Sequence, residues 1–366
     1  MRIFKCIGIT ILVLILIFLV YAAYVFLSYY RLDDNLELDV AAPAIGTSSE
    51  DGDDADSKVP LNTELDVTSW NIGFAAYTDD FTFFMDGGEE SRARSEESVL
   101  ETMKKITEYL NSFNSDFHLI QEVDTDSTRS YHVNQYDLIS EAFAKQYKTF
   151  AQNYDSPYLM YPILQPHGKS KAGIVTLSDY VITDAIRRSL PIQEDFGKLI
   201  DLDRCYSINR IPCQNGKELV LVNVHLSAYT TDHTIADQQL EVLYEDLIKE
   251  YEKDNYVVCG GDFNKDLLGD SPKYFGVPKE EDYSWAESFP MDSVPDGFTL
   301  VSSVDDENPV ASSRLANMPW DQAKDFQITL DGFIVSDNIQ VLECKVLDLK
   351  FECSDHNPVN LRFALK

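Results

Sequence analysis

The chain has 366 residues, 44% of them apolar, which is enough for one large folded domain or two ordinary ones and excludes a wholly disordered protein. Its formal net charge of −32 opposes loose binding to polyanions, because nonspecific affinity for nucleic acids depends on Lys and Arg that neutralise phosphates. Any phosphate chemistry must therefore rely on local positive charge.

The N-terminal segment is strongly apolar. From Ile7 to Leu27 the chain runs for 21 residues without a charge, and a helix of that length covers the roughly 30 Å hydrocarbon core of a bilayer. This indicates a membrane span or a long signal peptide. Basic residues before the run and acidic residues after it predict a cytoplasmic N-terminus, and bulky residues follow where a cleavage site needs small ones. We expect residues 1–31 to be an uncleaved single-pass anchor in the cell membrane, with the rest of the chain outside the cell.

Residues 32–64 read as an acidic flexible linker, because the stretch 41–60 is small, polar and without periodicity. A flexible chain of that length holds a domain about 30 Å from the bilayer. Four basic and ten acidic residues lie in 1–64, so a charge of −26 remains on residues 65–366, which we expect to be the folded domain.

The six cysteines include no CxxC pair, which argues against structural zinc. Cys205 and Cys213, like Cys344 and Cys353, flank short segments that could be hairpins. Disulfides at these pairs and free buried thiols both remain open readings.

The first half of the domain alternates strands and helices. A strand over 65–71 ends at Asn71, and apolar residues at helical spacing predict a helix that reaches Phe113, with Ser98 and Glu101 as a capping box. A second strand over 117–123 ends in acids that include Glu122. Arg129 follows as the first cation well placed for a phosphate, with Tyr131 beside it, and a further helix is expected to continue to about residue 147.

In the second half, an almost continuously apolar strand over 218–226 carries His225 near its end. A helix to Tyr251 precedes a strand over 256–262 that ends in Asp262 and Asn264. Residues 266–320 lack a clear period and read as long loops, one of which holds Arg314. Strands over 328–335, with Asp331, and 346–351 precede Ser354-Asp355-His356, and a strand over 359–363 closes the domain.

Each polar residue at these strand ends has an ordinary structural explanation when taken singly, such as a turn former or a satisfied core histidine. Their recurrence favours one shared site, because ligand sites in α/β folds gather at strand ends. Oxygen ligands from Glu122 and Asn71 suit Mg²⁺ or Mn²⁺, and a water near His356 could then attack phosphorus. A carboxylate beside an imidazole, as in Asp355-His356, can orient the ring as a general base.

These segments resemble the endonuclease/exonuclease/phosphatase superfamily, over residues 65–366. The motifs that carry the resemblance are WN71, QE122, NVH225L, GGD262FN264, LD331GFIV and SD355H356N. The resemblance implies an α/β fold of two packed β-sheets flanked by helices, a four-layer sandwich. It also implies that Glu122 and Asn71 bind the metal, that His356 is the base oriented by Asp355, and that His225, Asp262, Asn264 and Asp331 complete the catalytic set.

The leading hypothesis is a divalent-metal-dependent phosphoester hydrolase outside the membrane, with Arg129, Tyr131 and Arg314 as candidate substrate-binding residues. Its substrate could be a phospholipid, a small phosphodiester or a nucleic acid, and no obligate protein partner is evident. Two departures from the superfamily pattern, Asp124 after QEV and Asn357 after SDH, leave the substrate open. An extracellular nuclease and a non-catalytic surface binding module on the same fold are the alternatives.

Overall fold

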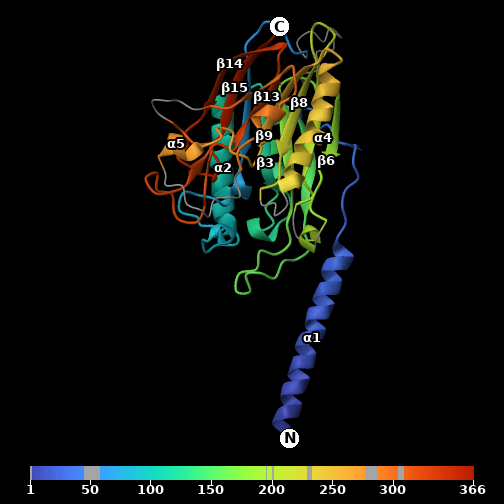
Figure 1. Ribbon diagram of the computed structural model, residues 1–366, viewed down its shortest axis with the longest axis vertical. Helices are drawn as coiled ribbons and strands as arrows, with labels where there is room; N and C mark the ends of the chain where they lie inside the picture. The colour runs from blue at the N-terminus through green and yellow to red at the C-terminus, as the bar shows by residue number, and fades with distance from the viewer. Residues whose placement is uncertain are drawn as a thin grey trace.

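Two mixed β-sheets pack face to face and are covered on their outer faces by helices, in a computed structural model of the chain (Figure 1). This confirms the four-layer α/β sandwich. The structure describes residues 2–44, 58–194, 196–199, 202–228, 233–276, 287–303 and 309–366.

The first sheet has six strands in the order β14-β15-β2-β3-β5-β4. β2 and β3 are parallel, and their neighbours run antiparallel to them. Alternating apolar residues in these strands bury one side chain in two toward the other sheet. The bounds are β2 Leu65–Asn71, β3 Phe117–Asp124, β4 Tyr147–Asp155, β5 Lys171–Ser178, β14 Ile339–Val346 and β15 Val359–Leu365.

The second sheet has seven strands in the order β1-β6-β7-β8-β9-β13-β10, and β8 and β9 form its parallel pair. β8 and β9 are buried on both faces, as their continuous apolar runs predict. The bounds are β1 Leu36–Glu37, β6 Asp184–Ser189, β7 Cys205–Pro212, β8 Glu218–His225, β9 Tyr256–Asp262, β10 Phe298–Val301 and β13 Asp331–Ser336.

Three apolar clusters correspond to the three interfaces between layers. The central cluster lies between the sheets, with Val67 of β2 and Leu221 of β8 among its members. A second lies between the six-stranded sheet and the helices α2 (Glu96–Phe113) and α3 (Gln135–Ala142). The third lies between the seven-stranded sheet and α4 (His233–Tyr251). The sheets are therefore held at fixed separation, which positions the ends of their strands.

Three local predictions are corrected by the structure. The capping box of α2 pairs Ser95 with Ser98, one turn before the expected pair. The helix expected to reach residue 147 ends at Ala142, and β4 begins at Tyr147. Residues 347–351 are no strand, because their amides turn to the following loop: Leu347 N donates to Pro358 O at 2.8 Å and Leu349 N to Asn357 Oδ1 at 3.1 Å.

The region expected to be mainly loops, 266–320, is irregular with short elements. These are α5 (Ser271–Phe275), β10 and β11 (Ser313–Arg314), which pairs with β12 (Gln327–Ile328). Residues 277–286 and 304–308 lie outside the described part. The strand expected over 328–335 is divided between β12 and β13, because Thr329 and Leu330 separate them.

The N-terminal helix α1 (Arg2–Ser28) projects from the domain (Figure 1) and is long and apolar enough to cross a membrane, with a mean hydropathy of 3.0 over an 18-residue window within Ile3–Ser28. A signal sequence would have the same length and composition. Of the expected linker, residues 45–57 are outside the described part. The rest contacts the domain: β1 pairs with β6, Ala41 bridges Lys148, and buried Val59 bridges Cys213. The described ends of this segment are attached by backbone hydrogen bonds.

The six cysteines, all within the described residues, are free thiols. Cys205 begins β7 and Cys213 directly follows its last residue, and the eight residues of β7 span roughly 25 Å when extended, too far for a disulfide. Cys344 packs with the cluster between the sheets, whereas Cys353 belongs to the cluster under α2. The positions of these four cysteines fit free thiols rather than disulfides.

Candidate active site

The ends of the two parallel strand pairs meet across the sandwich. The side-chain amide of Asn71, the last residue of β2, donates to Glu122 Oε1 of β3 at 3.2 Å and to Asp262 Oδ2 of β9 at 3.1 Å. The first contact lies within the six-stranded sheet, and the second joins it to the seven-stranded sheet. Three residues that the sequence places at separate strand ends are therefore in one cluster.

Glu122 owes its position to an irregularity in β3. The pairing of β3 with β5 shifts register between Ile120 and Val123. The backbone of Glu122 has a φ of +56°, which is uncommon for residues other than glycine. Such backbone strain persists where the surrounding structure enforces it, and it clusters at functional sites. The bulge aims the carboxylate of Glu122 toward Asn71.

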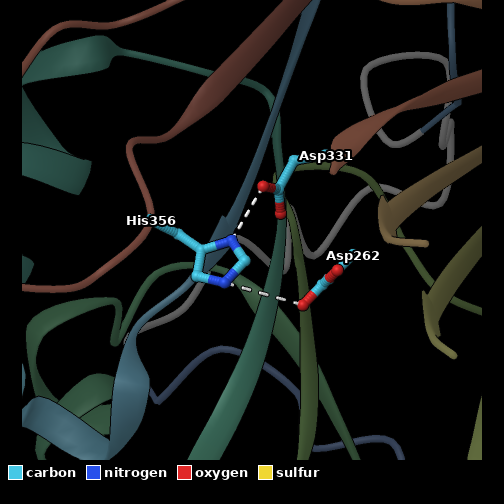
Figure 2. A group of neighbouring side chains, drawn as sticks. All are labelled: Asp262, Asp331 and His356. Carbon is cyan, nitrogen blue, oxygen red and sulfur yellow. Dashed lines mark hydrogen bonds and ion pairs between the residues drawn. The ribbon is translucent and has the colours of Figure 1, made fainter. Parts of the chain in front are cut away.

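His356 lies between two aspartates. Its Nδ1 is 2.8 Å from Asp331 Oδ2, and its Nε2 is 3.8 Å from Asp262 Oδ2 (Figure 2). Asp331 begins β13 and pairs with Asp262 at the end of β9. We expected Asp355 to orient the ring, but the residue hydrogen-bonded to it is Asp331. The carboxylate of Asp355 instead accepts a 3.3 Å hydrogen bond from Ser354 Oγ.

A group of residues that the sequence did not single out holds this pair. Ser312 Oγ donates to Asp331 Oδ2 at 2.7 Å and accepts from the amides of Leu330 and Asp331 at 2.9 and 3.0 Å. Ser313 Oγ lies 3.4 Å from His356 Nε2. Both serines lie in a region without periodicity, so no sequence pattern marked them.

The loop that carries His356 is fixed to β2. Trp70 Nε1 donates to His356 O at 2.8 Å, and Ser354 Oγ donates to Asn71 O at 2.7 Å. The WN and SDH segments, 283 or more positions apart in the chain, are thus directly hydrogen-bonded.

Burial and charge set the protonation of the site. Burial alone lowers the pKa of His356, but the attraction of Asp331 and Asp262 outweighs it and raises that pKa well above its usual value. Burial raises the pKa of Asp262, and raises that of Asp355 to about 6. For His225, burial with nearby positive charge from Arg204 holds the pKa well below its usual value, so this imidazole is neutral at pH 7.

His225 and Asn264 complete the cluster around Asp262. His225 Nε2 is 3.6 Å from Asp262 Oδ2, and Asn264 N donates to Asp262 Oδ1 at 2.9 Å. The side-chain amide of Asn264 donates to Leu226 O at 2.8 Å, which joins the GDFN turn to the end of β8. Asp262 is therefore the residue at which the polar contacts of both sheets converge.

The donor set fits a hard divalent cation. Glu122, Asp262, Asp331 and Asp355 place four carboxyl groups near one another, and oxygen donors of this kind are those that Mg²⁺ and Mn²⁺ take. Asp331 Oδ1 and His225 Nδ1 are buried without a hydrogen-bond partner among the residues that the structure describes. Asp262, Asp331 and His356 offer atoms within 4.8 Å of one another. The hydrogen bond between His356 and Asp331 already uses one of these atoms from each of the two residues. Glu122, beside Asn71, is therefore a better candidate for the metal ligand than this group.

The three candidate substrate residues are placed differently. Arg129 is buried, bonded to Asp124 Oδ1 at 2.8 Å and stacked 3.9 Å from the centre of the Phe74 ring. Tyr131 donates its hydroxyl to Arg94 O at 3.0 Å, so no hydrogen bond joins it to the cluster in the described residues. Arg314 is buried and donates to carbonyls that include Thr78 O at 3.1 Å, and its own amide binds Asp355 O at 3.0 Å. Their contact with substrate stays a prediction.

Comparison with protein-family models gives one match: the model described as the Endonuclease/Exonuclease/phosphatase family covers residues 68–356. That range includes every residue of the cluster described above. None of the curated proteins with which the sequence was compared matches it.

The solved structures that are similar in fold include the following three. An endonuclease/exonuclease/phosphatase from Beutenbergia cavernae has a TM-score of 0.57 and 16% identity, and the match covers 82% of this chain and 72% of that one. ANGEL2, described as a 2',3'-cyclic phosphatase, has a TM-score of 0.55 and 15% identity over 82% and 96%. The human Nocturnin catalytic domain has a TM-score of 0.51 and 16% identity over 90% and 97%. At such identities the likeness concerns the fold alone.

Proposed function

Because this chain belongs to the endonuclease/exonuclease/phosphatase family, we propose that it is a divalent-metal-dependent phosphoester hydrolase. The observation that carries the proposal is the position of Asn71, whose amide binds Glu122 and Asp262 beside the His356–Asp331 pair. A metal ligand, a phosphate-binding group and a general base are thereby within reach of one reacting phosphorus.

In the proposed mechanism Glu122, with Asn71, would hold Mg²⁺ or Mn²⁺. The cation would polarise the phosphoryl oxygens and offset the charge of the surrounding carboxylates. Above its raised pKa, where the ring is neutral, His356 takes a proton from the attacking water at Nε2, while Asp331 at Nδ1 holds the ring in place and stabilises the imidazolium that forms. Asp262 and Asn264 orient the water. Neutral His225 supplies a ring N–H that can stabilise charge on a phosphoryl oxygen.

We place the enzyme on a membrane through α1, with the domain outside the cell. Support for an anchor comes from the length and apolar composition of α1, which are enough for one span. The outward orientation rests on the basic residues before the span and the acidic ones after it.

A phospholipid or a small phosphodiester suits the domain better than a nucleic acid. The charge of −26 on residues 65–366 repels a polyanion, Arg129 is already paired with Asp124, and Arg314 donates to carbonyls such as Thr78 O. Among the proteins of similar fold, ANGEL2 is described as a 2',3'-cyclic phosphatase, and a cyclic phosphate of this kind is a phosphodiester.

Hydrolysis of bis(p-nitrophenyl) phosphate, with Mg²⁺ and with excess chelator, tests the proposal. We expect activity with Mg²⁺ and its loss with chelator, with Glu122→Gln and with His356→Ala. The matched control is His132→Ala, since His132 is an exposed histidine paired with Asp126 outside the cluster. Full activity of Glu122→Gln or His356→Ala would refute the assignment of those residues.

A panel of phospholipids, cyclic nucleotides and oligonucleotides then separates the alternatives. Hydrolysis of DNA or RNA, with binding that weakens steeply as salt rises, would support the nuclease reading. Mg²⁺ binding measured by calorimetry, with no turnover on any member of the panel, would support the binding module. Turnover of the lipids or small diesters alone is the result that we expect.

A further inference from the structure

The loop between β4 and β5, residues 156–170, exposes a cluster of large apolar side chains. The exposed fractions are 53% for Met160, 69% for Tyr161, 84% for Ile163 and 99% for Leu164. Elsewhere in the described part of the domain, large exposed apolar residues are scattered, as Leu100, Met291 and Leu342 are. A contiguous apolar surface of this kind marks an interaction site.

The backbone holds this loop in an outward conformation. Leu159 and Gly168 exchange two backbone hydrogen bonds of 3.0 Å each, and Gln165 N donates to Pro162 O at 3.1 Å. At the base, buried His167 contacts Ser91 O through Nδ1 at 2.7 Å. The apolar side chains at the tip therefore stay in solvent unless something outside the domain covers them.

The same loop contacts the end of the apolar helix α1. Tyr21 Oη donates to Tyr158 O at 3.1 Å, and Tyr158 N donates to Tyr24 Oη at 3.0 Å. Tyr21 and Tyr24 lie one to two turns before the helix ends at Ser28. Tyrosines at the end of a span occupy the membrane interface, so the loop lies at the depth of that interface if α1 crosses the bilayer.

Strand pairing puts the candidate active site at this end of the domain. Asp124, two residues after Glu122, pairs with Ala172 at the start of β5, and Lys171 pairs with Asp155 at the end of β4. The loop thus leaves the six-stranded sheet at the edge where β3 delivers Glu122. In Figure 1 the domain presents this end toward α1, and the C-terminus lies at the other end.

We propose that residues 158–164 form a second membrane contact, which inserts Ile163 and Leu164 into the lipid bilayer that α1 spans and turns the active-site end of the domain toward the lipid. The occupant of the apolar surface is lipid because the loop backbone at Tyr158 and Met160 is hydrogen-bonded to the end of α1, itself apolar enough for a membrane. The acidic domain gains little from charged lipids, so the contact relies on apolar burial. The domain then lies on the surface rather than about 30 Å above it.

This inference rests on α1 as an anchor and not on the proposed hydrolysis, so its test measures lipid contact and no turnover. The full chain is reconstituted in phosphatidylcholine nanodiscs that contain brominated acyl chains, which quench nearby tryptophan. Leu164→Trp is compared with Leu342→Trp, a control on β14. Its neighbour Val341 pairs with Phe363, which pairs with Leu65 at the start of β2, the end opposite to Asn71. Both positions are exposed, so neither change disturbs the core, and circular dichroism checks the fold.

We expect strong quenching and a blue shift for Leu164→Trp, weak quenching for Leu342→Trp, and no effect of high salt. Equal quenching of the two variants would overturn the proposal, because it would leave the loop in water or against protein. Quenching that needs anionic lipid and disappears at high salt would also overturn it, in favour of electrostatic docking. Loss of hydrolytic activity in either variant would leave this result unchanged.

Discussion

Nδ1 of His356 and Oδ2 of Asp331 are 2.8 Å apart, although the two residues lie 25 positions apart in the chain and a different aspartate adjoins the histidine in sequence. The contact brings the loop after β14 to the first residue of β13. It fixes which ring nitrogen is free, because Nε2 is left facing Asp262 and Ser313.

The first prediction concerns this pair. Asp331→Asn should lower kcat about 10²–10⁴-fold, the range of a general base, since the ring loses its orientation and the charge that stabilises the imidazolium. Asp331 raises the pKa of His356, so its neutralisation should move the ascending limb of the pH–rate profile to lower pH. Asp355→Asn is the control, and a larger loss there than in Asp331→Asn would contradict the pairing.

Ser312 should affect catalysis indirectly, by holding the carboxylate of Asp331 in place. Ser312→Ala removes one hydrogen bond to the carboxylate and leaves the amides of Leu330 and Asp331 without their acceptor, which should cost about 1–3 kcal/mol in the free energy of unfolding. It should lower kcat about tenfold, with KM little changed, because Asp331 is then free to move. Steady-state kinetics and urea denaturation measure the two effects, and Ser312→Thr should recover part of the rate.

Substitution of Arg129 tests whether this residue stabilises the fold or binds substrate. Its buried bond to Asp124 means that Arg129→Ala leaves an unpaired carboxylate in the core, and unfolding should become easier by about 3–5 kcal/mol. Arg94→Ala is the control, because Arg94 pairs with Asp80 and Glu90 at the surface and should change stability by less than about 1 kcal/mol. An Arg129→Ala variant of full stability but raised KM would show that Arg129 binds substrate.

A pH-dependent contribution to stability is expected at Glu250. Burial alone raises the pKa of this carboxyl, but hydrogen bonds from Arg210 and Lys253 outweigh it and lower the pKa to about 2. A group whose pKa is lowered by folding stabilises above its unfolded value and loses that effect as pH falls. Glu250→Gln should therefore cost about 1–3 kcal/mol at pH 7. The difference from the parent chain should shrink below about pH 4, and guanidinium denaturation at the two pH values checks it.

Much of the site could be predicted because its residues stand at the ends of strands that the apolar pattern locates. Asn71, Glu122, His225 and Asp262 each follow a run whose alternation or continuity marks a strand, and parallel strands bring their ends together. The partner of His356 could not be predicted in this way, because Asp355 is adjacent in sequence whereas Asp331 is adjacent only once β13 is paired with β9.

Other errors have the same origin in tertiary contacts. The run 346–351 has the composition of a strand, but its amides bind the loop that carries Asn357, and β14 lies before it. Tyr147 has the spacing of the preceding helix, yet it pairs with Ser178 in the sheet. The composition of residues 32–64 predicts a flexible linker, whereas pairings such as Leu36 with Arg187 depend on an edge of the sheet that local composition does not encode.

The placement of the cysteines has a practical consequence. Cys205 is buried at the start of one strand and Cys213 directly after its end, and Cys259 lies within another, so the described fold holds together without a covalent cross-link. Its thermal midpoint should be the same with and without a reductant such as dithiothreitol. The domain should accordingly fold equally well when it is produced in a reducing bacterial cytosol or an oxidising secretory compartment, which widens the choice of host for every measurement above.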